Sequence, residues 1–179
     1  LPSLPMSLGV GSSVTFTVAF VPNNVGGLTA NLRVNDSSFT LAGTGTQPPA
    51  LPSYTIQGPS GTQSPSQQLN VGLSLASAYP MALQGTLTMS FVSGVFTDDP
   101  AIQFASGGRT VKFTIPANST QAVFANNAST IPLQTGTVAG NIVITPAFTM
   151  QTGGFDLTPA SPSTLTMTVA RLAPQLLNA

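Results

Sequence analysis

The carboxylates are the first side chains to consider for chemistry, because the sequence contains no His, Cys or Glu. Without His and Cys there is no imidazole base, no thiol nucleophile and no usual ligand set for zinc or an iron–sulfur cluster. A Ser-His-Asp triad is therefore excluded. A glycosidase would have to pair two of the four aspartates, Asp36, Asp98, Asp99 and Asp156. Two of these are adjacent, and adjacent side chains of an extended chain point in opposite directions.

Two further chemistries would depend on only one or two charged residues. A Ser–Lys dyad would have to use Lys112, which stands in the alternation Val111–Ile115 and is expected to face solvent. A Ca²⁺ site needs roughly six to eight oxygen ligands, and only Asp98 and Asp99 are close in sequence. A turn before Pro100 is the expected role of this pair. We therefore predict no enzyme, and no catalytic, cofactor-binding or metal-binding residue.

Carbohydrate binding has a few candidate residues. Tyr54 and Tyr79 could form a sugar-stacking platform, although the chain has no Trp and isolated aromatic rings more often pack at sheet ends. Asn35, Asn118 and Asn127 each begin an Asn-X-Ser/Thr glycosylation sequon, a match that arises by chance in a chain rich in these residues. A carbohydrate-binding module remains the alternative function, with a glycan as its partner.

The charge content excludes other classes of partner. Only 4% of the residues are charged, whereas an average chain devotes roughly a quarter to charge. Four scattered basic residues cannot neutralise the phosphates of a nucleic acid or hold an anionic membrane surface. No apolar stretch approaches the ~18 residues needed to span a bilayer. The net charge of zero gives weak colloidal repulsion, which suits a module fixed in a larger chain or assembly.

The hydropathy pattern predicts an all-β protein, because period-2 alternation dominates the sequence. Residues Val14–Phe20 and Leu28–Val34 each place four apolar or small side chains on one face, and Phe39 with Leu41 marks a third short strand. Pro and Asn residues between these strands favour turns. We expect residues 13–43 to form a three-stranded meander.

A second group of strands follows a boundary at residues 43–52, GTGTQPPALP, where Gly and three prolines interrupt regular pairing. The expected strands are 54–57, 69–75, 83–91, 109–115, 121–124, 137–145 and 165–172. Their spacing and their one-sided alternation are typical of an antiparallel immunoglobulin-like β-sandwich with one wet and one packed face.

Residues 4–45 carry a recognisable pattern: an apolar-Gly lead-in, Thr15–Phe20 followed by Pro22, a Gly-containing turn, an alternating strand and the closing segment Leu41–Gly45. This pattern resembles the second half of the Hydin-type, major-sperm-protein-like immunoglobulin domain of bacterial choice-of-anchor D surface proteins. Residues 50–179 look like the immunoglobulin-like module that follows such domains. The resemblance implies tandem immunoglobulin-like sandwiches, export, a role in surface architecture and no catalytic residues.

The resemblance also divides the chain into parts. Residues 1–46 match the C-terminal half of a Hydin-type domain, 47–53 a Pro/Gly linker, 54–172 a sandwich, and 173–179 a linker to a following module. Because the sequence opens at Leu1 without Met or a signal segment, we expect an internal fragment of a longer protein. A half domain of about 45 residues without Cys or His is not expected to be stable alone. Its open edge should meet upstream strands or accept a strand from another chain.

The expected function is a non-enzymatic structural or adhesive module of a secreted or cell-surface bacterial repeat protein. Its expected partners are neighbouring immunoglobulin-like modules or identical subunits, joined through sheet edges by β-strand pairing. No nucleic acid and no membrane insertion are expected.

Overall fold

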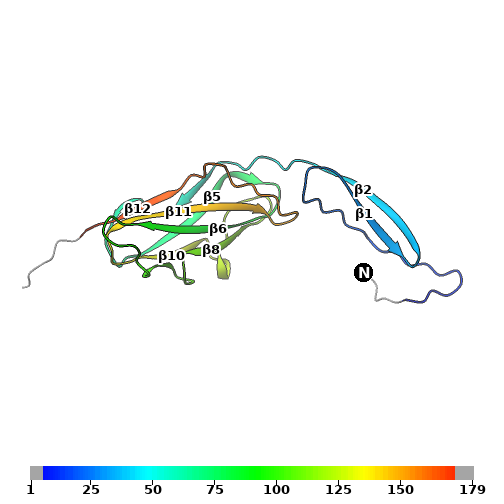
Figure 1. Cartoon of the computed structure of the whole chain (residues 1–179), viewed down its shortest axis with the longest axis horizontal. Coiled ribbons are helices and arrows are strands. Elements are labelled where there is room, and N and C mark those ends of the chain that lie inside the picture. Colours follow the sequence, from blue (N-terminus) through cyan, green and yellow to red (C-terminus); the bar gives the residue numbers. More distant parts are fainter. Residues whose placement is uncertain (1–5, 172–179) are drawn as a thin grey trace, which may run out of the picture. The chain divides into compact units, whose positions relative to one another are not determined.

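A boundary between Gln47 and Pro48 divides the chain into two units, and Figure 1 labels the longer strands of each. The computed structural model describes residues 6–171. The described elements are strands, apart from one three-residue 3-10 helix, Ala125–Asn127. The prediction of an all-β protein built from antiparallel sheets is confirmed.

The first unit contains one β-hairpin. Strand β1, Gly26–Val34, pairs antiparallel with β2, Ser37–Gly45, and Val34 lies opposite Ser37. This register leaves a two-residue turn, in which Asn35 has a φ of 51°. Asn tolerates this left-handed conformation better than most residues, and the turn forms where the sequence predicts it. The second strand is longer than predicted, because it continues through Gly43–Gly45, which the sequence analysis assigned to the boundary.

The prediction of a third strand at Val14–Phe20 is wrong. Residues 12–22 belong to no strand, and residues 13–43 therefore form a hairpin preceded by an unpaired segment rather than a three-stranded meander. The alternation of this segment determines which side chains share a face. A strand also requires a neighbouring backbone, and in the described residues neither edge of the hairpin supplies it.

The second unit is a sandwich-like pair of five-stranded sheets. The first sheet has the order β3-β5-β10-β7, and β9 also pairs with β5. Its strands are β3 Tyr54–Gln57, β5 Gln68–Tyr79, β10 Thr130–Thr135, β7 Ile102–Phe104 and β9 Ser119–Gln121. All pairs in this sheet are antiparallel.

The second sheet has the order β4-β12-β11-β6-β8. Its strands are β4 Gly61–Gln63, β12 Leu165–Val169, β11 Gly140–Met150, β6 Leu83–Val92 and β8 Thr110–Ile115. Only β4 and β12 run parallel. The strand orders β3-β5-β10-β7 and β12-β11-β6 are consistent with the two sheets of an immunoglobulin-like sandwich, but β8 and β9 lie between β7 and β10 in the chain, where that topology has no strand.

Most expected strands of this unit are confirmed, and the errors are local. The strand expected at 137–145 begins at Gly140 and runs to Met150. The strand expected at 121–124 is wrong, because β9 ends at Gln121 and Val123 makes only an isolated bridge to Thr114. The sequence analysis missed β4, β7 and β10. The strand expected at 165–172 ends at Val169, and position 172 itself lies outside the described residues.

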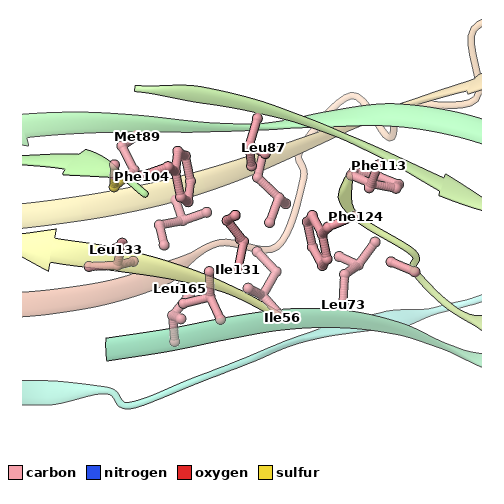
Figure 2. Packing of buried hydrophobic residues seen from close by; sticks show 14 of the residues in the cluster. Ile56, Leu73, Leu87, Met89, Phe104, Phe113, Phe124, Ile131, Leu133 and Leu165 are labelled. Atoms are coloured by element: carbon pink, nitrogen blue, oxygen red, sulfur yellow. The ribbon is translucent and has the colours of Figure 1, made fainter. Parts of the chain in front are cut away.

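The hydrophobic core lies between the two sheets of the second unit. All 24 buried hydrophobic residues of the described chain fall between Ile56 and Val169. Strands β8 and β12 bury every second side chain, which confirms one packed and one wet face. Figure 2 shows Leu73 of β5, Leu87 of β6 and Phe113 of β8 pointing into this interior.

A buried tyrosine ties the start of the second unit to its core. The Tyr79 ring is 1% exposed, and its hydroxyl donates a hydrogen bond of 2.8 Å to the carbonyl of Pro49. Replacement Tyr79→Phe keeps the ring but leaves this carbonyl without its donor, so we expect urea denaturation to show a loss of about 1 kcal/mol. The matched change Tyr54→Phe removes a longer bond of 3.2 Å to the Ser163 carbonyl and should cost less. Equal losses of stability in the two variants would contradict the role assigned to the Tyr79 hydroxyl.

Candidate functional site

The buried carboxylate of Asp99 anchors a loop. One of its oxygens accepts hydrogen bonds from the backbone N–H groups of Thr137 (2.6 Å) and Val138 (2.8 Å), and the other accepts one from Ala101 (2.9 Å). Burial acts to raise the pKa of Asp99, but these backbone donors outweigh it and hold the pKa below its ordinary value. Gly136 makes room for the carboxylate, because a Cβ there would lie 2.5 Å from Oδ2.

The neighbouring Asp98 is exposed and forms an ion pair with Arg109. The hydrogen bond from this guanidinium lowers the pKa of Asp98. The Asp99 carbonyl accepts the N–H of Ile102 at 3.1 Å, which closes the turn predicted before Pro100. In the described residues no group of three or more His, Cys, Asp or Glu side chains could hold a metal ion.

The other residues named from the sequence occupy structural positions. Lys112 is exposed on β8, as predicted. Tyr79 is buried, and the half-buried Tyr54 packs its ring 4.8 Å from that of Phe148, so the two tyrosines form no platform. The three sequon asparagines all have positive φ angles between 51° and 60°, which gives each Asn a conformational role in its turn. No helix among the described residues is long and apolar enough to cross a membrane.

The strongest surface feature lies in the first unit. Eleven of the fourteen exposed large hydrophobic residues belong to it, and none of its described hydrophobic side chains is buried. They are Met6, Leu8, Val10, Val14, Phe16, Val18, Phe20, Val21, Val25, Val34 and Phe39, with exposed fractions from 38% to 109%. Most of the exposed large hydrophobic residues of the described chain are therefore concentrated in its first unit.

One face of the hairpin is apolar along most of its length. In the β1–β2 register Leu28 lies opposite Gly43, Ala30 opposite Leu41, and Leu32 opposite Phe39. Directly opposite residues of an antiparallel pair share a face, so these side chains form one continuous apolar face. We call this the hairpin face.

The unpaired segment 14–21 lies over the hairpin face. A Cβ on Gly43 would lie 2.7 Å from the ring of Phe20, and a Cβ on Gly45 would lie 3.0 Å from the side chain of Pro22. The two glycines therefore allow the segment to approach the hairpin closely. The first unit thus has two layers, of which one is a hairpin and the other is a single unpaired segment.

The space between these two layers is incompletely filled. An open hollow of about 490 Å³ is bordered by Phe16, Leu32, Val34 and Phe39, together with polar turn residues. A second, of about 550 Å³, is bordered by the apolar residues Val18, Phe20, Leu28 and Leu41 among others. Protein interiors leave few voids larger than a water molecule. Both hollows are open to solvent, so the apolar side chains that border them are only partly covered.

The fold and this surface together define an all-β protein with one complete sandwich and one open apolar unit. No family model matches the chain, and no curated protein matches it. The sequence predicted an incomplete first unit with an open edge. It did not reveal that segment 14–21 lies unpaired over the hairpin face, although the alternating glycines of Gly43-Thr44-Gly45 were a signal for the close approach of another segment.

Proposed function

We propose that this chain is a non-enzymatic structural or adhesive module of a secreted or cell-surface bacterial repeat protein, which assembles with identical subunits or neighbouring modules through its first unit. The observation that carries the proposal is the contrast between the units. The second unit has a complete core, whereas eleven large hydrophobic residues of the first unit are exposed and none is buried.

The size of the apolar surface supports assembly. The eleven side chains are about half exposed on average, so they present on the order of 800 Å² of apolar area if each fully exposed side chain is given roughly 150 Å², the lower end of the aromatic range. At about 25 cal/mol per Å², burial of this area corresponds to roughly 20 kcal/mol before the costs of association. Those costs are estimated at about 4–15 kcal/mol, so the surface is large enough to support a stable complex.

The positions of the aspartates support a role outside catalysis. Asp99 holds three backbone N–H groups, Asp98 pairs with Arg109, and Asp156 accepts a hydrogen bond of 2.9 Å from the N–H of Thr158. Each of these carboxylates stabilises a loop or turn, and they do not converge on one cavity. The resemblance of residues 4–45 to surface-protein domains supports export, and the low charge content suits a module held in an assembly.

Two measurements over a dilution series test this function: light scattering reports the oligomeric state, and hydrogen exchange reports which amides are protected. We expect the amides of β5, β6 and β11 to be protected at every concentration, because their sandwich has its own core. Amides of β1 and β2 should gain protection only when the chain is bound to a protein partner. Protection of β1 and β2 in a monomer would contradict the proposal, since the first unit would then be stable without a partner.

A further inference from the structure

We infer that the partner of the first unit is a second copy of this chain, and that the two copies pair their segments Val14–Phe20 antiparallel, with Thr17 opposite Thr17. This inference rests on the proposed function, and it specifies the partner and the register.

The segment has the features of a strand that lacks a neighbour. Val14, Phe16, Val18 and Phe20 alternate with Thr15, Thr17 and Ala19. In the described residues the N–H and C=O groups of positions 13–22 form no backbone hydrogen bond. Residues 13–21 are exposed, so these backbone groups are open to pairing, and a second extended strand provides partners along the whole segment.

The register follows from the symmetry of the segment. Antiparallel pairing about Thr17 places Phe16 opposite Val18, and Val14 opposite Phe20 of the other copy. Each of these cross-strand pairs joins an aromatic ring to a β-branched side chain, a combination that stabilises sheets. The resulting two-fold axis is perpendicular to the paired strands and keeps the apolar side chains of both copies on the same face.

The same symmetry would complete the two-layer architecture. Both hairpin faces would lie on the apolar side of the new two-stranded layer, so that two open units combine into one sandwich. The side chains of the second copy would then border the hollows next to Phe16 and Val18.

Area and charge favour a second copy as the occupant. The exposed apolar area of the whole first unit is on the order of 800 Å², which is comparable to the total area of about 800 Å² that each partner contributes to a standard protein interface. Residues 6–32 include no charged side chain, so two copies meet without like-charge repulsion. A partner selected by charge would find no complementary group on this part of the surface.

Single-cysteine variants test the register directly, because the chain has no native Cys. In Thr17→Cys the two thiols would face each other across the two-fold axis. Opposite residues of an antiparallel pair have Cα atoms about 4.5–5.5 Å apart, within the range that a disulfide spans. In the control Thr15→Cys, which alters the same face, the two thiols would be displaced by four residues, roughly 13 Å.

Under mild oxidation we expect Thr17→Cys to form a covalent dimer at least about tenfold faster than Thr15→Cys, as measured on non-reducing gels. An equimolar mixture of Thr15→Cys and Ala19→Cys should form the mixed dimer, because these positions lie opposite each other in the same register. Covalent dimers of Thr15→Cys and Thr17→Cys at equal rates would overturn the register.

Light scattering and hydrogen exchange on the unmodified chain separate this inference from the proposed function. A dimer whose β1 and β2 amides lose protection on dilution supports both the second copy as partner and the proposed function. A monomer at all concentrations with unprotected β1 and β2 overturns the second copy as partner, while a role in assembly with another protein stands. A monomer with protected β1 and β2 overturns both.

Discussion

Replacement Phe148→Ala is expected to lower the unfolding free energy of the sandwich by about 4 kcal/mol. Phe148 lies in β11, the strand between β6 and β12, and its side chain is fully buried. Its ring centroid is 4.8 Å from that of Tyr54 and 5.6 Å from that of Phe113. The substitution removes contacts with strands of both sheets and leaves a cavity that a closely packed core cannot close.

Urea denaturation followed by circular dichroism measures this loss. The matched control is Phe96→Ala, because the Phe96 side chain is 61% exposed in a loop. Substitutions of this kind usually change stability by less than about 0.5 kcal/mol. If both variants lost the same stability, Phe148 would not be a central residue of the core.

The strand predicted at Val14–Phe20 is absent, which shows what an alternating pattern can and cannot predict. Alternation reports which side chains share a face, and Phe16, Val18 and Phe20 do border the space above the hairpin. Pairing depends on a second backbone, which can come from distant residues or from another chain, and no local pattern specifies it. The sequence therefore predicted the face correctly and the sheet incorrectly.

The strands missed in the second unit have a different explanation. β4 and β7 have three residues each, which is too short to show alternation. β10 contains Pro132, a residue that usually argues against a strand inside a sheet because it has no N–H to donate. β10 still pairs with β5 in regular register, because Ile131 and Leu133, on either side of Pro132, are buried in the core. Burial on one face outweighed the local preference of a single residue.

The role of Asp99 could be predicted only in part. Pro100 indicated a turn, and the turn is present. The donors to the carboxylate belong to Thr137 and Val138, 38 and 39 residues further along the chain. Contacts at this separation depend on the packing of β7 and β10 side by side, so no spacing rule in the sequence reveals them.

Replacement Asp99→Ala is expected to cost about 3 kcal/mol of unfolding free energy, because it leaves three backbone N–H groups without their acceptor in a buried loop. The control Asp98→Asn removes the charge of an exposed neighbour that pairs with Arg109, and it should change stability little. Chemical denaturation of both variants at neutral pH makes the comparison. Similar losses in both would show that the buried hydrogen bonds are not the cause.

The pH dependence gives a second and independent test of Asp99. Its pKa is lowered in the folded chain from an ordinary value of 3.8, so its contribution to stability is fully present above that value. The contribution is lost as the pH falls through the folded pKa, because the unfolded chain binds the proton more readily. The stability difference between the wild-type protein and Asp99→Ala should therefore shrink as the pH falls below about 3.8. A difference that stayed constant down to low pH would mean that the charge of Asp99 does not stabilise the loop, and that the substitution acts through packing alone.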